Sequence, residues 1–320
     1  MRVFLAGGSG AIGRRLIPLL VSCGHDVVAT TRHQTRTNDL RLLGAEPVVV
    51  DALDRAAVVD AVRSASPEVV IHQLTALSNF RNMKKLDEEL ALTNRLRTEG
   101  TKFLLEAAQA ARARRFIAQS FTGWPNAREG GPVKTEDDPL DSRPPESMAK
   151  TLAAIRQLET MVVSARNLEG VALRYGAFYG PGTQISPGGQ IVEMVRKRML
   201  PIFGTGAGVW SFVHIDDAAR ATLLAMEHGP SGIYNIVDDD AAPASVWIPA
   251  LAELIGARPP RHLPVWIGRL IIGEAGISMM TQIRGSSNAK AKRLLDWKPA
   301  YTSWRDGFRR MFLEDGREAA

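Results

Sequence analysis

The segment "RVFLAGGSGAIGRRLIPLLV" (residues 2–21) contains the pattern that decides the fold. Its first five residues are mostly apolar and predict a buried strand, and the apolar positions within 12–21 predict a helix. The loop between them has G-x-x-G-x-x-G spacing, formed by Gly7, Gly10 and Gly13. Such a loop allows a tight turn and a close approach of the backbone to a pyrophosphate. Because a helix N-terminus offers free N–H groups and a positive dipole end, the segment predicts dinucleotide binding.

The alternation of strands and helices continues beyond this segment. Further apolar runs predict strands at 26–30, 47–50, 68–72, 115–119, 170–174 and 232–237. Strands this short and apolar are typically buried on both faces, and their alternation with helices predicts a parallel sheet. We therefore expect an α/β protein with a Rossmann-type doubly wound parallel sheet and a smaller C-terminal substrate-binding subdomain.

The domain organisation follows from where this alternation holds. Residues 1–177, together with 213–240, predict the dinucleotide-binding Rossmann domain. Residues 178–212 and 241–320 break the alternation, contain many Pro and Trp residues, and predict the substrate-binding subdomain. Residues 123–145 are rich in Gly, Pro and acidic residues and predict a long loop, which in a compact domain is usually functional.

The composition excludes several classes of protein. Of 320 residues, 45% are hydrophobic and 23% charged, which is typical of a globular protein, and the one cysteine excludes an intrachain disulfide. No leader precedes the first strand and no apolar run reaches the ~18 residues of a membrane span, so we expect a cytoplasmic protein with no membrane partner. The net charge of +6 is scattered and not interleaved with aromatic residues, so we expect no nucleic-acid partner. The carboxylates of 238–240 have no histidine at ligand spacing, so we expect no metal site.

The residue at the end of the second predicted strand decides the expected cofactor. A carboxylate about 20 residues beyond the glycine loop would bind the ribose 2′-hydroxyl of NAD. Here "ATTRHQ" has Arg32 in that place, and a guanidinium pairs with a 2′-phosphate through charge-assisted hydrogen bonds. Arg14 adds a second positive charge just after the last glycine. The sequence therefore predicts NADP; the alternative is that Arg32 is a solvated loop residue.

Several further segments resemble one family. They are "VVVDALD", "VIHQLTAL", "TNRLRTEGTKFLLEAA", "LRYGAFYGPG", "FVHIDDAARA" and "SNAKAKRLLDWKP". With the glycine loop, they make most of the chain similar to an extended short-chain dehydrogenase/reductase of the NAD-dependent epimerase/dehydratase family. The resemblance implies that residues 51–52 lie at the adenine and that residues 74–76 pass along the cofactor. The cofactor-binding residues we expect are Gly7, Ser9, Gly10, Ala11, Ile12, Gly13, Arg14, Arg32, Asp51, Ala52, Leu74, Thr75, Ala76, Ser120, Tyr175 and Ala177.

The main departure from the family pattern lies in "ESMAKTLAAIRQLE" (146–159). The family has a tyrosine in this helix as general acid/base and a lysine four residues later, and the resemblance puts Thr151 and Ile155 in the two places. No register of this stretch gives a tyrosine and a lysine four residues apart, so we expect an atypical member that lacks the Tyr-x-x-x-Lys pair. The remaining candidates for a catalytic role are Ser120, Thr122 and Tyr175.

A second departure concerns the substrate. Family members that act on nucleotide sugars have an arginine in G-x-G-x-x-x-R, whereas "GTGAGVWSFVHIDD" has Trp210 in that place. A tryptophan cannot pair with a diphosphate but offers a broad apolar face. We therefore expect an apolar small-molecule substrate. In the "HIDD" stretch (214–217), we expect a helix start that an aspartate caps.

Three functions remain open at this point. The first is an NADP(H)-dependent oxidoreductase of an apolar small molecule, with a proton from a non-standard donor, from water or from the substrate. The second is a redox-inactive NADP-binding sensor or scaffold, and the third is a non-redox isomerase, cyclase or dehydratase on the same fold. Because family members commonly pair through two long helices, here expected at 86–111 and 147–165, we also expect a homodimer.

Overall fold

The central sheet has seven strands that all run parallel. The computed structural model describes residues 1–77 and 82–314. The strand order is β12-β7-β5-β4-β1-β2-β3, and every neighbouring pair is parallel. In that order the strands are β12 (Gly232–Ile236), β7 (Glu169–Tyr175), β5 (Arg115–Phe121), β4 (Val69–His72), β1 (Arg2–Ala6), β2 (Asp26–Thr31) and β3 (Glu46–Val49). The chain thus starts in the middle of the sheet and winds outward in both directions, which confirms the predicted doubly wound Rossmann-type fold.

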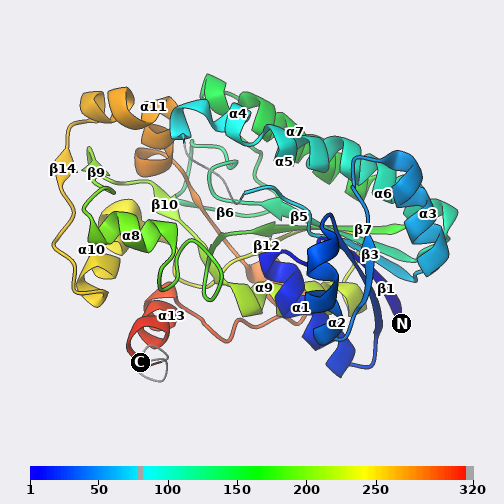
Figure 1. Cartoon of the computed structure of the whole chain (residues 1–320). Coiled ribbons are helices and arrows are strands. Elements are labelled where there is room, and N and C mark those ends of the chain that lie inside the picture. The colour runs from blue at the N-terminus through cyan, green and yellow to red at the C-terminus, as the bar shows by residue number, and fades with distance from the viewer. Residues whose placement is uncertain (78–81, 315–320) are drawn as a thin grey trace.

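Helices cover both faces of this sheet (Figure 1). The first layer consists of α1 (Ala11–Ser22), α2 (Thr37–Leu42) and α9 (Ile215–Glu227). The second layer consists of α3 (Arg55–Ala65), α6 (Thr101–Ala110) and α7 (Ala149–Val163). Within β1, Val3 and Leu5 pack toward the first layer, whereas Phe4 and Ala6 pack toward the second. A strand buried on both faces needs apolar residues at every position, which is why the sequence of β1 shows no polar alternation.

The predicted long helix at 86–111 is divided into four pieces. They are α4 (Leu86–Glu89), α5 (Ala91–Arg95), a π-helical turn (Leu96–Gly100) and α6. In the π-helical turn, the carbonyl of Leu96 accepts a hydrogen bond from Nε2 of His72, at 3.2 Å. This turn therefore joins the second helix layer to the end of β4.

The smaller subdomain lies beside the carboxyl ends of the strands (Figure 1). Its helices are α8 (Gln190–Arg196), α10 (Ala244–Leu254), α11 (Val265–Thr281) and α13 (Trp304–Arg309). Short strands pair as β8 (Ala177–Tyr179) with β11 (Phe212–His214), β9 (Ile202–Phe203) with β14 (His262–Leu263), and β10 (Val209–Trp210) with β13 (Ala242–Pro243). Its core contains aromatic rings with centroids 5.3 to 5.9 Å apart, from Phe212, Trp247, Trp304 and Phe308. α11 is kinked at Gly273, which has φ 69° and ψ −177°.

One part of the predicted substrate-binding subdomain packs elsewhere. The prediction put all of 241–320 in that subdomain, but β15 (Gly285–Ser286) pairs with β6 (Val133–Lys134) of the long loop. The next helix, α12 (Ala289–Leu294), leads to Trp297, which is fully buried in the same core as α1 and α9. Burial of this large apolar side chain holds the segment on the Rossmann domain. No helix within the described ranges combines the length and the apolarity of a bilayer-spanning segment.

A buried carboxylate also fixes the C-terminal segment to α9. The N-cap of α9 is His214, whose Nδ1 accepts the amide of Asp216 at 3.3 Å, so the expected aspartate cap is wrong and a histidine takes its place. Asp217 is fully buried, and its carboxylate accepts the amides of Ala300 and Tyr301, each at 2.9 Å. Asp217 therefore pairs with two partly buried backbone amides of the C-terminal segment.

We expect Asp217→Ala to lower the free energy of unfolding by roughly 2–4 kcal/mol, because two partly buried amides and the guanidinium of Arg220 lose the buried carboxylate that they share. Asp216→Ala is the matched control: this neighbouring side chain is 44% exposed, and its loss should cost less than about 1 kcal/mol. Urea unfolding followed by circular dichroism measures both. Equal losses in the two variants would contradict the role of Asp217.

Candidate functional site

The glycine loop forms a cradle of bare backbone between β1 and α1. A Cβ atom at Gly13 would lie 2.4 Å from the carbonyl oxygen of Gly7, so only glycine lets α1 begin this close to the end of β1. Gly7 has φ +98°, in the left-handed region that favours glycine. Among the described residues no side chain caps α1, whose N-cap is Gly10, so its first N–H groups remain available to a ligand. This geometry fits the predicted pyrophosphate site.

Two arginines lie beside the cradle. Arg32 follows the end of β2, where the hydroxyl of Ser9 lies 3.4 Å from that of Thr31 and links the loop to this strand. Arg32 is exposed, and so is Arg14 in the first turn of α1. Neither forms an ion pair with any side chain in the described part of the chain. Both guanidinium groups are therefore free to pair with a phosphate.

The remaining expected cofactor segments gather at the same edge of the sheet. β4, β1, β2 and β3 are parallel neighbours in that order, so the segments that follow their ends lie side by side. These segments are the glycine loop, Arg32, Asp51 with Ala52, and 74–76. Asp51 is exposed, and its Oδ1 accepts the amide of Leu53 at 3.0 Å. Doubly wound sheets bind dinucleotides at this carboxyl edge.

Buried side chains fix the backbone of the segment 74–76. Nδ1 of His72 accepts the amide of Leu74 at 3.1 Å. Burial lowers the pKa of His72 to about 4, so the ring is neutral at pH 7 and accepts at one nitrogen while it donates at the other. The hydroxyl of Thr93 accepts the amide of Ala76 at 3.0 Å. The segment that we expect along the cofactor is thus held by side chains whose role the sequence did not indicate.

Ser120 points toward the second helix layer. Its hydroxyl donates to Oε1 of Glu159 on α7, at 2.6 Å. Arg174 on β7 forms two hydrogen bonds to the same carboxylate, each at 2.7 Å, and both members of this ion pair are 5% exposed. Ser120 therefore belongs to a buried charge network and does not line the pocket described below.

Tyr175 lies in the core between the sheet and α9. Its hydroxyl is 2.7 Å from the hydroxyl of Thr222 and accepts a hydrogen bond from Nε2 of Gln73 at 3.1 Å. Burial raises the pKa of Tyr175 to about 12. A phenol with this pKa and two buried partners is poorly suited to exchange protons near pH 7.

The two predicted tyrosine and lysine positions on α7 are both fully buried. The hydroxyl of Thr151 donates to Oδ1 of Asp87 at 2.6 Å and accepts from Nδ2 of Asn94 at 2.9 Å. Asp87 also accepts the amides of Lys150 and Thr151, at 2.9 and 2.8 Å, and so satisfies the start of α7. Ile155 packs among apolar side chains. The start of α7 is thus hydrogen-bonded to α4 and α5 through Asp87 and Asn94. Neither Thr151 nor Ile155 offers a free acid or base.

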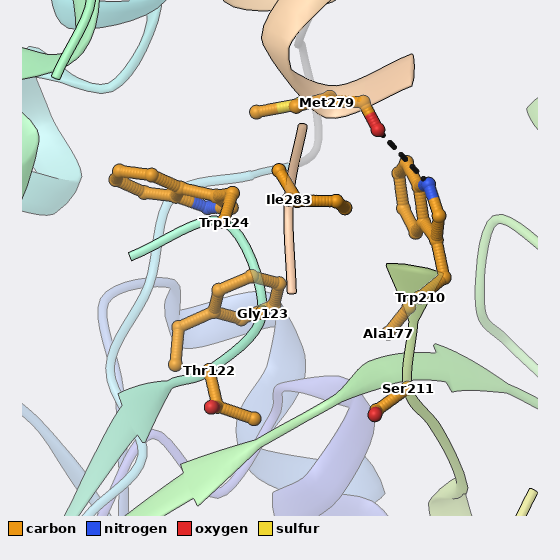
Figure 2. Close-up of a pocket in the computed structure, with 9 residues that line it drawn as sticks. Thr122, Gly123, Trp124, Ala177, Trp210, Ser211, Met279 and Ile283 are labelled. Atoms are coloured by element: carbon orange, nitrogen blue, oxygen red, sulfur yellow. Dashed lines mark hydrogen bonds between the residues drawn. The ribbon is translucent and has the colours of Figure 1, made fainter. Parts of the chain in front are cut away.

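A pocket opens just beyond the end of β5. Nine residues line it: Phe121, Thr122, Gly123, Trp124, Ala177, Trp210, Ser211, Met279 and Ile283. Figure 2 shows two tryptophans, a methionine and an isoleucine around the cavity, with the hydroxyls of Thr122 and Ser211 at its base. Nε1 of Trp210 donates to the carbonyl of Met279 at 3.2 Å, so this wall is tied to α11. The lining is almost entirely apolar.

The sequence had indicated only part of this lining. Thr122, Ala177 and Trp210 were expected at the site, and Trp124 lies in the predicted long loop. Ile283 was missed, because it follows the end of α11 and nothing local distinguishes it from a core residue. Within residues 1–77 and 82–314, no group of three or more His, Cys, Asp or Glu side chains could hold a metal ion.

Known proteins resemble this chain in sequence and in fold. The model of the "NAD dependent epimerase/dehydratase family" matches residues 3–237. A 3-diazoavenalumate denitrifying reductase from Streptomyces sp is 44% identical over 311 residues, which cover 97% of this chain and 100% of that protein. A 4-hydroxy-2-methyl-3-oxo-4-farnesyl-3,4-dihydroquinoline-1-oxide ketoreductase from Stigmatella aurantiaca is 28% identical over 86% of this chain and 83% of its own length. The solved UDP-glucose 4-epimerases of Thermotoga maritima, with UDP-glucose, and of Thermus thermophilus, with NAD, have TM-scores of 0.77 and 0.73 at 23% and 25% identity, and each comparison covers 100% of both chains.

We expect Glu159→Gln to lower the free energy of unfolding by roughly 3–5 kcal/mol, because the guanidinium of Arg174 would stay buried without a counter-charge. Glu99→Gln is the control, since Glu99 forms an exposed pair with Arg95 and its loss should cost less than about 1 kcal/mol. Guanidinium chloride unfolding followed by tryptophan fluorescence measures both. A loss below about 1 kcal/mol for Glu159→Gln would mean that the buried pair is not needed for stability.

Proposed function

We propose that this chain, which belongs to the NAD dependent epimerase/dehydratase family, is an NADP(H)-dependent reductase of an apolar, aromatic small molecule. The position of the apolar pocket carries this proposal. Residues 121–124 of its lining lie at and just beyond the end of β5, at the same carboxyl edge as the glycine loop. A dinucleotide on the loop and a substrate in the pocket would therefore share one crevice, as the reactants of a hydride transfer must.

The preference for NADP over NAD is supported by charge at the end of β2. Arg32 and Arg14 are exposed beside the glycine cradle, at the end of β2 and the start of α1. A guanidinium binds a 2′-phosphate through paired, charge-assisted hydrogen bonds. The UDP-glucose 4-epimerase of Thermus thermophilus, which has a similar fold, binds NAD, so the affinities for NADPH and NADH must be compared directly.

The identity of the substrate is supported by the pocket and by the relatives. No basic side chain is among the nine lining residues, so a sugar diphosphate would find no charged partner there. The relative that is 44% identical is named for the denitrifying reduction of a diazo compound, and the Stigmatella relative is named for the reduction of a ketone. By analogy with the Streptomyces relative, we propose that the group reduced by this chain is a diazo group on an aromatic molecule.

The proposed role of Thr122 is to position the substrate. It is the one expected catalytic residue among Ser120, Thr122 and Tyr175 that lines the pocket. Its hydroxyl lies 2.6 Å from that of Ser286. A threonine hydroxyl has too high a pKa to exchange protons efficiently near pH 7, but it can orient a bound molecule.

A redox-inactive cofactor-binding sensor is the second candidate. The observation that favours it lies on α7, at the two places where the family has its tyrosine and lysine. Thr151 and Ile155 occupy these places, and both are buried in packing or hydrogen bonds. Oxidation of NADPH in the presence of an aromatic diazo compound separates the two candidates, because a sensor would bind the cofactor without oxidising it. An isomerase or dehydratase would convert its substrate with no net oxidation of the cofactor.

A homodimer through the second helix layer remains part of the proposal. α7 places several side chains on the exposed side of that layer, including Lys150, Arg156 and Val163. Two copies that pair through this face would leave the pocket of each open, because the pocket is lined from other elements. Sedimentation across micromolar concentrations tests this arrangement.

We expect Arg32→Asp to weaken binding of NADPH by roughly 2–4 kcal/mol while NADH binding changes much less, because a charge-assisted contact is lost and a repulsion is added. Arg36→Asp is the control, because Arg36 lies four residues further along, is 53% exposed and is paired with Asp39; it should leave both affinities nearly unchanged. Titration calorimetry of the parent protein and of both variants with NADPH and NADH measures the six affinities. Equal binding of NADPH and NADH by the parent protein would refute the NADP preference.

A further inference from the structure

Among the residues that the structure describes, those that line the pocket offer no group that can supply a proton at neutral pH. None of its nine lining residues has a side chain that titrates near pH 7. Its two hydroxyls are both engaged by the same residue: Thr122 Oγ1 lies 2.6 Å from Ser286 Oγ, and Ser211 Oγ accepts the amide of Ser286 at 2.8 Å. The indole N–H of Trp210 is used by the carbonyl of Met279.

This composition restricts which acceptors can be reduced there. Hydride addition to a neutral carbonyl produces an alkoxide, and a positioned acid with a pKa near the working pH must then supply a proton. A cationic acceptor becomes neutral when it takes up a hydride, so no proton from the protein is needed. A pocket without a proton donor therefore suits an acceptor that arrives with its own positive charge.

The walls of the pocket also suit a cation. Aromatic faces attract positive charge through their quadrupole, and tryptophan does so most strongly. Trp124 and Trp210 stand on two sides of the cavity in Figure 2, and the lining contains no lysine or arginine that would repel a cation. Trp210 is also held in place by its hydrogen bond to α11, so its face is already oriented before a ligand binds.

We infer that the pocket binds the cationic, diazonium form of an aromatic substrate against the face of Trp210 and reduces it with no proton from the protein. This inference rests on the proposed function and specifies its electrophile. The hydride of NADPH forms an N–H bond at the terminal nitrogen, which converts Ar–N≡N⁺ to neutral Ar–N=N–H and leaves NADP⁺. Loss of N₂ then breaks the C–N bond, and the N–H proton ends on the ring carbon to give Ar–H. The diazonium group gains the two electrons that the cofactor loses.

The test compares an arenediazonium salt with the aryl nitrile of the same framework, which has nearly the same shape and no charge. The KM of the diazonium salt and the inhibition constant of the nitrile are measured for the parent protein and for Trp210→Leu, Trp210→Phe and Trp266→Leu. Trp266 is a suitable control because it is 62% exposed and does not line the pocket. Reactions without protein correct for direct reduction of the salt by NADPH.

We expect Trp210→Leu to weaken the diazonium salt roughly 3- to 30-fold more than the nitrile, because only the cation loses attraction to the ring. Trp210→Phe should restore most of this difference, and Trp266→Leu should change neither value. The rate with the salt should vary less than about threefold between about pH 5.5 and 7.5, since no protein acid takes part. Equal losses for salt and nitrile in Trp210→Leu, or a rate that follows the titration of a single group, would overturn the inference.

A matched aryl ketone distinguishes the failure of this inference from that of the proposed function. If the ketone is reduced as fast as the diazonium salt, the enzyme is a reductase with a hidden proton donor, and only the inference fails. If NADPH binds but is oxidised with neither acceptor, the proposed function fails and the inference fails with it.

Discussion

The contact between Gly13 and the carbonyl of Gly7 is the constraint on which the site depends. It brings the start of α1 onto the end of β1, and a single methyl group at position 13 would prevent this. β1 lies in the middle of the parallel sheet, so its end is flanked by the ends of β4 and β2. Three features therefore lie close together at the end of β1: the first N–H groups of α1, the exposed Arg32 and the hydrogen-bonded segment 74–76. The small subdomain contributes Trp210 and Met279 to a pocket beyond the end of β5, at the same edge of the sheet.

Much of this arrangement could be predicted from the sequence, because its determinants are local. An apolar run followed by spaced glycines and a helical pattern defines the first strand, turn and helix without reference to the rest of the chain. The departure at Trp210 was also readable, since one side chain replaces another at a defined distance from two glycines. The NADP preference, the apolar substrate and the dimer remain predictions.

What could not be predicted depends on partners distant in sequence. Ser120 looked like a catalytic candidate, but its direction is set by Glu159, which is in turn held by Arg174. Asp217 looked like a helix cap, yet it binds amides more than 80 residues further along the chain. Trp297 packs in the same core as α9, and its local sequence does not indicate this distant partner. Polar networks of this kind are specified only when the whole core is assembled.

The tie between Trp210 and α11 has a consequence for how such a protein can diversify. The glycine loop lies at the end of a central strand, whereas Met279 lies in the last turn of a helix that is kinked at Gly273, and Ile283 follows that helix. Changes in that helix can resize or tilt the substrate wall without disturbing any strand of the sheet. The shape of the pocket and the geometry of the glycine loop can thus change, or be engineered, as separate traits of one chain.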